Sequence, residues 1–142
     1  MIAIGSDHGG YELKCHIIEQ LKGKEIKDFG VYSEESVDYP DIAKVVCEAV
    51  KAGECEYGIL ICGTGIGISI AANKIDGIRA SVCGDCYSAK MARKHNNANV
   101  LCLGGRVLGT ELADMIVDTW LSEDFEGGRH QRRIDKIHDL EK

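Results

Sequence analysis

Residues 57–74 read YGILICGTGIGISIAANK, and this stretch decides the fold class. It begins with a continuous apolar run, Tyr57–Cys62, of the kind found in strands that are buried on both faces. Glycines follow at positions 63, 65 and 67, and a short helix is predicted over Ile66–Asn73. A doubly buried strand that enters a helix through a tight turn indicates a parallel sheet covered by helices.

The same alternation extends along the whole chain. Strands are predicted over Met1–Gly5, Glu25–Phe29, Tyr57–Cys62, Arg79–Cys83 and Val100–Leu103. Helices are predicted over Tyr11–Lys22, Pro40–Ala52, Ile66–Asn73, Tyr87–His95, Leu108–Leu121 and Arg129–Leu140. The apolar face of the helix over residues 40–52 is expected to consist of Ile42, Val45, Val46, Ala49 and Val50. We therefore predict one domain over residues 1–142, a Rossmann-like three-layer αβα fold with a five-stranded parallel sheet.

Composition excludes several classes of protein. The chain has 142 residues, 44% of them hydrophobic and 28% charged, as in an ordinary globular domain. A net charge of −6 argues against a nucleic-acid partner. No apolar run reaches the roughly 20 residues that cross a bilayer, and no basic leader precedes the first strand. We expect a cytoplasmic protein without a membrane partner, whose seven cysteines are reduced thiols.

The architecture indicates where a ligand binds. In open parallel sheets, ligands bind outside the carboxyl ends of the strands. That rule selects four loops, which are residues 6–10, 63–67, 84–87 and 104–106. Three of the four are rich in glycine, so the backbone can approach a ligand closely there.

The turn after Cys62 is the strongest candidate. The free N–H groups of a helix N-terminus favour an anion, and they also favour the thiolate form of a nearby cysteine. The G-x-G-x-G spacing differs from the dinucleotide fingerprint, and no Walker lysine follows, so we predict an anion hole. Cys62 can then act as a nucleophile or as a general base. The alternatives are glycines that only shape the turn and a cysteine that only fills the core.

Other candidates carry weaker signals. Asp7-His8 ends the first strand and can bind substrate, or Asp7 can simply cap a helix. His95-Asn96 ends a helix, where His95 suits proton transfer or a favourable dipole interaction. Arg129 and Arg133 share a helix face and can clamp a phosphate, or they can be solvated charges. The pair Cys83 and Cys86 has no second pair of ligands, so neither a metal site nor a redox role is favoured.

Together these segments resemble the ribose/galactose/allose phosphate isomerase family, over essentially the whole chain. The resemblance rests on five segments: Ser6–Gly10, Asp38–Pro40, Ile61–Lys74, Arg93–Asn96 and Gly127–Arg133. It implies an aldose–ketose isomerase that interconverts D-ribose 5-phosphate and D-ribulose 5-phosphate through an enediolate. Open alternatives are a hexose 6-phosphate substrate (allose or galactose 6-phosphate), a non-catalytic sugar-phosphate sensor, and a redox protein that uses Cys83 and Cys86.

The resemblance also implies a role for each site residue. Cys62 is expected to be the general base, with Thr64 assisting proton transfer, and His95 to open the sugar ring with Asp7 as a second candidate. The enediolate is expected to bind the turn formed by Gly63, Thr64, Gly65, Ile66, Gly67 and Ser69. Contacts with sugar hydroxyls and with the phosphate are expected from Asn96, His8, Arg106, Arg129 and Arg133. No metal or organic cofactor is implied. Members of the family are dimers or tetramers with shared sites, so the helix over residues 129–140 is expected to contact a partner subunit.

Overall fold

The computed structural model describes residues 1–141, which contain one five-stranded parallel sheet. Its strands lie in the order β2-β1-β3-β5-β4, and every pair of neighbours is parallel. The strands are β1 (Ile2–Ser6), β2 (Ile26–Asp28), β3 (Tyr57–Cys62), β4 (Ala80–Val82) and β5 (Val100–Gly104). The predicted fold class is confirmed, because short apolar segments separated by helices form a parallel sheet.

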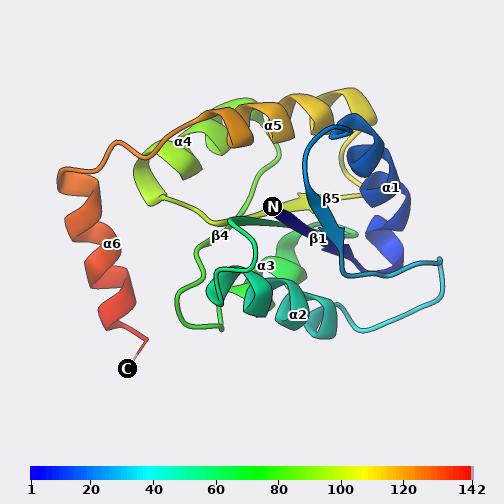
Figure 1. Cartoon of the computed structure of the whole chain (residues 1–142), viewed down its shortest axis with the longest axis horizontal. Coiled ribbons are helices and arrows are strands. Elements are labelled where there is room, and N and C mark those ends of the chain that lie inside the picture. The colour runs from blue at the N-terminus through cyan, green and yellow to red at the C-terminus, as the bar shows by residue number, and fades with distance from the viewer. Residues whose placement is uncertain (142) are drawn as a thin grey trace.

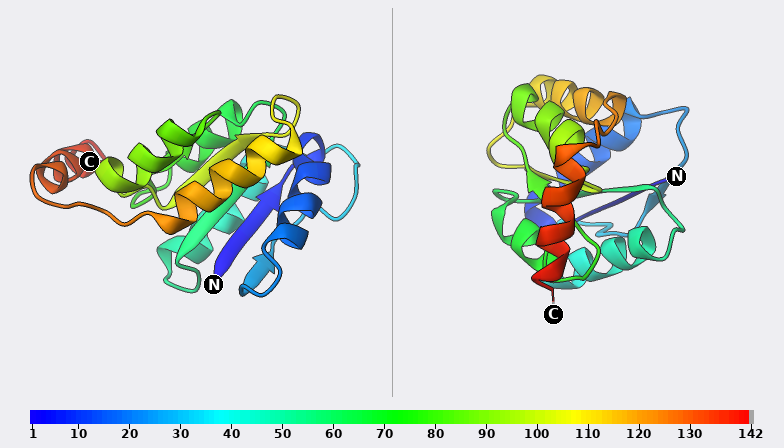
Figure 2. Two further views of the ribbon diagram at one scale, coloured as in Figure 1. Left: turned by 90° about the horizontal axis from the view of Figure 1, so that it is seen from above. Right: turned by 90° about the vertical axis from the view of Figure 1, so that its left-hand side faces the viewer.

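Helices cover both faces of this sheet (Figure 1). Helices α1 (Tyr11–Gln20), α4 (Cys86–Asn96) and α5 (Thr110–Ser122) pack on one face. Helices α2 (Tyr39–Lys51) and α3 (Ile66–Ala72) pack on the other face. Figure 2 shows the resulting three layers from two further directions.

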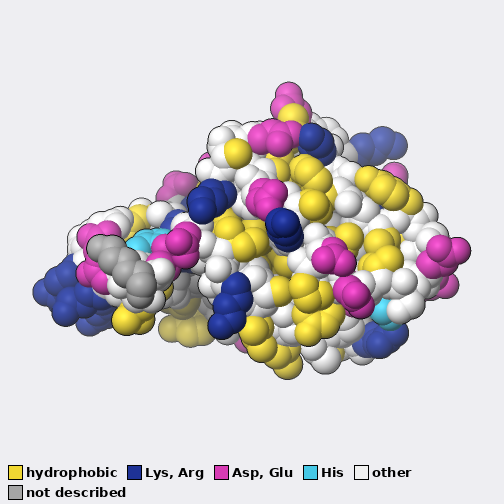
Figure 3. Space-filling view, turned by 90° about the horizontal axis from the view of Figure 1, so that it is seen from below, with side chains coloured by type: hydrophobic (Ala, Val, Ile, Leu, Met, Phe, Trp, Pro, Cys, Tyr) yellow, Lys and Arg dark blue, Asp and Glu magenta, His cyan; other side chains and the backbone are white. Residues whose placement is uncertain are grey.

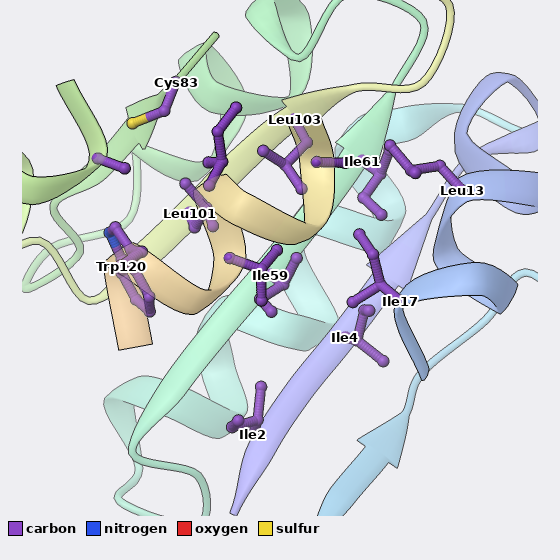
Figure 4. Close-up of a cluster of buried hydrophobic side chains, with 14 of the residues drawn as sticks. Ile2, Ile4, Leu13, Ile17, Ile59, Ile61, Cys83, Leu101, Leu103 and Trp120 are labelled. Atoms are coloured by element: carbon purple, nitrogen blue, oxygen red, sulfur yellow. The ribbon is translucent and has the colours of Figure 1, made fainter. Parts of the chain in front are cut away.

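Strand β3, the continuous apolar run of the sequence, lies at the centre of the molecule. In β3, Ile59 and Ile61 pack toward α1 and α5, whereas Leu60 and Cys62 pack toward α2 and α3. Figure 4 shows the first of these clusters, in which Ile59 lies near Trp120 of α5. Because successive side chains of a strand point to opposite faces, a strand between two helical layers must be apolar throughout.

Helix α6 (Arg129–Asp139) stands apart from the two layers (Figures 1 and 2). It packs against the end of α4, and only His130 and Ile134 of its residues are buried. A cavity of about 570 Å³ lies between the second half of the helix and the domain, and Ile137 is 46% exposed. At the end of the helix, His138 Nε2 lies 3.0 Å from Arg79 Nη1, and the nearby Glu141 carboxylate accepts the N–H of Gly77 at 3.1 Å. Figure 3 shows Lys and Arg side chains gathered at this end of the molecule and apolar side chains scattered over the α2–α3 face. The expected contact of α6 with a partner subunit stays a prediction.

Two local expectations differ from the structure. Val45 is 41% exposed, whereas the buried face of α2 is centred on Ala43, Val46, Cys47 and Val50. Those four positions follow the i, i+3, i+4, i+7 spacing of one helix face, and Val45 lies beside it. The sequence also gave no indication of η1 (His8–Gly10), a short 3-10 helix before α1. Across residues 1–141, none of the helices combines the length and apolar character that crossing a bilayer requires.

Candidate active site

Three loops meet at the carboxyl edge of the sheet, where the architecture predicted a ligand site. Asp7 donates its backbone N–H to the carbonyl of Ile61 at 3.1 Å. Gly105 donates to the carbonyl of Cys62 at 2.8 Å, and Arg106 donates to that of Gly63 at 3.0 Å. The loops that follow β1, β3 and β5 therefore form one hydrogen-bonded unit.

Glycine is required where these loops touch. A Cβ atom on Gly105 would lie 2.7 Å from the carbonyl oxygen of Gly9, which is closer than real Cβ contacts allow. Gly65 adopts φ +80°, a left-handed conformation that glycine reaches without steric cost. Gly65 and Gly105 are therefore needed to build the site, whatever their further part in binding.

Cys62 lies at the centre of this unit and is 5% exposed. Its Sγ accepts a hydrogen bond from the backbone N–H of Gly65 at 3.2 Å. The N–H groups of Gly67 and Ile68, in the first turn of α3, have no acceptor within residues 1–141. Such orphan donors at a helix start favour a negatively charged ligand. The thiol and the free donors thus lie within the same turn.

Thr64 and Ser69 flank the thiol and differ in exposure and in hydrogen bonding. Thr64 is exposed, and its Oγ1 accepts from the N–H of Ile66 at 3.2 Å. Ser69 is buried, its hydroxyl donates to the carbonyl of Ile66 at 2.7 Å, and its N–H donates to that of Gly65 at 3.3 Å. Thr64 is open to a ligand, whereas both donors of Ser69 hold the turn together. Direct binding of substrate by Ser69 stays a prediction.

Asp7 is a structural cap in this chain. Its Oδ1 accepts the N–H groups of Gly9 at 2.9 Å and Gly10 at 3.2 Å, and its side chain is buried. The capping alternative raised by the sequence is therefore correct for one carboxylate oxygen. Participation of Asp7 in ring opening stays a prediction.

A cavity of about 320 Å³ opens beside these loops. It is lined by the side chains of His8 and Arg106 and by two carboxylates that sequence reasoning missed, Glu12 and Glu34. Gly9, Leu13 and Gly105 complete the lining. His8 Nδ1 lies 3.4 Å from the backbone nitrogen of Val37 and accepts its N–H, which fixes the ring. The Arg106 guanidinium lies over Gly63, with Nη1 3.4 Å from the place where a Cβ would stand. An anionic group can reach both side chains in this cavity.

The remaining candidates lie at the opposite edge of the sheet. Helix α4 runs antiparallel to the strands and ends at Asn96, shortly before β5 begins at Val100. Val100 is paired with Gly58, whereas Cys62 is paired with Gly104 at the far end of the same ladder. Four residues of strand separate these two levels by about 13 Å. The structure therefore does not bring His95 and Asn96 to the Cys62 of the same chain.

Arg129 and Arg133 belong to this second group. Both side chains are exposed on α6, one helical turn apart, and neither forms an ion pair within residues 1–141. Asn96 is exposed on the wall of the larger cavity, which Ile137 of α6 also lines. Two unpaired guanidinium groups on one face suit a phosphate.

His95 has two neighbours that sequence reasoning missed. Its ring stacks on that of His130, with centroids 4.1 Å apart and planes inclined by 10°. Glu126 Oε1 lies 3.4 Å from His95 Nε2 and 3.6 Å from His130 Nε2. The sequence offered no signal for this cluster, because 31 to 35 positions separate its members from His95.

His95, Glu126 and His130 could also be considered as metal ligands. Among the His, Cys, Asp and Glu side chains of residues 1–141, these three form the group whose ligand atoms are close enough to hold one metal ion. The ligand atoms lie within 4.8 Å of one another. An imidazole nitrogen directs its lone pair in the plane of the ring, however, so two parallel stacked rings direct their lone pairs side by side. The arrangement therefore does not suit chelation of one ion.

The Cys83–Cys86 pair has a structural explanation. Cys83 is buried, and its burial raises the pKa of the thiol to about 11. Between the two cysteines, Asp85 accepts the N–H of Ser88 at 2.7 Å and caps α4. A buried thiol with a raised pKa is a poor nucleophile. The motif therefore forms a helix start and part of the core.

Known proteins resemble this chain over nearly its whole length. A family model described as Ribose/Galactose Isomerase matches residues 2–137. Ribose-5-phosphate isomerase B of Escherichia coli (strain K12) is 55% identical over 142 residues, covering 99% of this chain and 95% of that protein. D-erythrulose-4-phosphate isomerase of Pectobacterium atrosepticum is 48% identical over 139 residues, covering 96% and 91%. The solved structure of ribose-5-phosphate isomerase B from Clostridium thermocellum has a TM-score of 0.98 at 60% identity, covering 99% and 96%.

Proposed function

The chain belongs to the ribose/galactose isomerase family, and we propose that it interconverts D-ribose 5-phosphate and D-ribulose 5-phosphate with Cys62 as the general base. The observation that carries the proposal is the position of the thiol. Its Sγ lies 3.2 Å from the Gly65 nitrogen, in a turn where the N–H groups of Gly67 and Ile68 have no acceptor within residues 1–141. A base beside an anion hole is what enolisation of an aldose requires.

The chemistry at the carboxyl edge is a proton transfer between two carbons. The Cys62 thiolate removes the proton from carbon 2 of the open-chain aldose and returns it to carbon 1. The N–H groups of Gly67 and Ile68 stabilise the enediolate oxygens, an interaction that is strongest in the transition state. The exposed Thr64 hydroxyl moves a proton between the two oxygens. No covalent bond forms between the sugar and the protein.

Ring opening is assigned to a second copy of the chain. His95 is the proposed acid, yet about 13 Å of strand lies between its level and that of Cys62. A sugar that contacts both groups must therefore lie between two subunits. The largely exposed α6 and the exposed Asn96 support this arrangement, in which each site combines the carboxyl edge of one chain with the amino edge of the other.

The phosphate is assigned to hydrogen-bond donors from both halves of this shared site. His8 and Arg106 line the cavity of about 320 Å³, and Arg129 and Arg133 approach from the α6 of the second copy. Guanidinium groups bind phosphate oxygens in pairs, so these three arginines, together with His8, can orient the sugar with its reacting carbons toward Cys62.

The test is an isomerase assay with ribose 5-phosphate on the native protein and on Cys62→Ala. We expect the rate to fall by at least about 10²-fold, the usual contribution of a positioned base. Cys86→Ser is the matched control and should retain the native rate. A Cys62→Ala variant with full activity would refute the role of Cys62 as the base, whereas a native protein without isomerase activity would leave a sugar-phosphate sensor as the better interpretation.

The same assay ranks the substrates. Allose 6-phosphate and galactose 6-phosphate represent the hexose alternative, and D-erythrose 4-phosphate represents the activity named for the Pectobacterium relative. We expect the highest kcat/KM for ribose 5-phosphate. A higher value for any of the others would change the assigned substrate and keep the enolisation chemistry.

A further inference from the structure

The cluster of His95, His130 and Glu126 at the end of α4 is held in place by several contacts, more than an exposed histidine requires. Glu126 donates its backbone N–H to the carbonyl of Lys94 at 3.0 Å, and its Oε2 lies 3.7 Å from Lys94 Nζ. The segment between α5 and α6 is therefore attached to the last turn of α4. This attachment places the Glu126 carboxylate against both imidazole rings.

The last turn of α4 is itself anchored by a buried cation. Arg93 donates to the carbonyl of Ala98 at 2.6 Å and to the hydroxyl of Tyr57 at 2.9 Å. Its guanidinium packs over the rings of Tyr57 and Trp120, at 4.7 and 5.5 Å from their centroids. The helix end that carries His95 is thus fixed in the core, and the Glu126 and His130 side chains then fix the ring.

The two histidines differ in exposure. The His130 side chain is 10% exposed, whereas that of His95 is 39% exposed and remains accessible. Burial lowers the pKa of His130, and the positive charges of His95, Arg129 and Arg133 lower it further. The lowered pKa favours a neutral His130 ring, and the Glu126 carboxylate beside both rings supplies a negative charge next to His95.

We propose that Glu126 and His130 are positioning residues that hold His95 as the acid for opening the sugar ring, an inference that rests on the proposed function. Glu126 supplies the counter-charge and orients Nε2, and His130 supplies a flat surface that prevents the ring from rotating. In the step, His95 gives a proton to the ring oxygen while the C1–O bond breaks and its electron pair moves to that oxygen. The hydroxyl proton of carbon 1 leaves to solvent, the aldehyde forms, and solvent reprotonates His95.

A difference between the two sugars separates ring opening from enolisation. Ribose 5-phosphate is mostly a closed furanose, whereas ribulose 5-phosphate stays open because its only ring-forming hydroxyl carries the phosphate. Consumption of ribulose 5-phosphate needs the enolisation machinery around Cys62 but no ring-opening acid, since the aldehyde product can leave and close in solution. A defect confined to ring opening therefore lowers the rate at saturating ribose 5-phosphate far more than the rate at saturating ribulose 5-phosphate.

The experiment compares Glu126→Gln and His130→Ala with the native protein on both sugars. We expect kcat to fall by about tenfold with ribose 5-phosphate and by less than about twofold with ribulose 5-phosphate. Glu126→Asp should restore part of the loss because it keeps the charge.

Asp124→Asn, in the same connecting segment, is the matched control and should change neither rate. Equal losses on both sugars would assign Glu126 and His130 a purely structural role, and unchanged rates would remove them from the reaction. Either result overturns the inference. Loss of the native rate with EDTA would also overturn it, by assigning the cluster to a metal ion. Failure of the proposed function is detected separately, by an active Cys62→Ala variant.

Discussion

The two edges of the sheet differ in the groups that they present to a ligand. The carboxyl edge is formed by backbone, with Gly9, Gly63 and Gly105 so close together that side chains are excluded. The amino edge is formed by side chains, where Glu126, His95 and His130 meet beside two arginines. Backbone donors suit a developing oxyanion, whereas titratable side chains suit proton delivery. The difference supports the proposal that each edge holds half of a site and that two chains combine to complete it.

The largest expected effect comes from mixing two inactive variants. Cys62→Ala and His95→Ala each damage a different half of the site, so each alone should have only a small residual rate with ribose 5-phosphate. If a dimer shares its two sites, half of the refolded dimers are mixed, each of these contains one intact site, and about a quarter of the native activity should return. The check is an assay after the two proteins are unfolded and refolded together. An additive rate, with no recovery, would place both groups in one chain.

Removal of one α6 arginine should come next in size. Arg133→Ala is expected to raise the KM for ribose 5-phosphate by about tenfold or more, because a charge-assisted hydrogen bond contributes about 1.5–3 kcal/mol. The kcat should change less, since the phosphate is remote from the reacting carbons. Arg132→Ala removes an exposed cation from the same helix and is the control. Equal KM values for the two variants would count against Arg133 as a phosphate ligand.

A test of the carboxyl edge is the addition of one methyl group. In Gly105→Ala the new Cβ would meet the Gly9 carbonyl at 2.7 Å, so we expect about 2 kcal/mol of lost stability and a displaced turn. Urea denaturation measures the first effect and the isomerase rate measures the second. Gly84→Ala, in another loop of this edge, has no atom within 4 Å of the new Cβ and should be nearly neutral. A stable and fully active Gly105→Ala variant would show that the contact between loops is unimportant.

The smallest effect is expected from the other thiols. Burial raises the pKa of Cys47 to about 12 and that of Cys83 to about 11, so both stay protonated and unreactive at pH 8. Alkylation with iodoacetamide followed by mass spectrometry should leave both unlabelled until the protein is unfolded. Activity that survives in Cys83→Ser and Cys86→Ser would exclude the redox alternative, and activity that disappears in both would restore it.

Sequence reasoning succeeded where the cause of structure is local. Tyr57–Cys62 is apolar at every position because both faces of β3 are covered, and Gly65 is glycine because the backbone there is left-handed. Sequence reasoning was less accurate where packing against neighbouring residues decides the exposure or the hydrogen bonding of a side chain. Val45 is apolar yet exposed, and the hydroxyl of Ser69 is used inside its own helix. Glu126 carried no signal at all, because its position beside His95 depends on how α6 returns to the end of α4.

By itself, the sequence determined the alternation of strands and helices, the buried central strand, and the glycine turn that holds Cys62. These features follow from side-chain periodicity and from backbone conformations that only glycine adopts readily. Only the tertiary structure decided which candidate residues lie close together. It places Cys62 and His95 at opposite edges of one sheet, and it brings Glu126 and His130 next to His95. The physical reason is that a parallel sheet returns the chain to its amino edge after every strand, so residues near in sequence are separated by the length of the sheet.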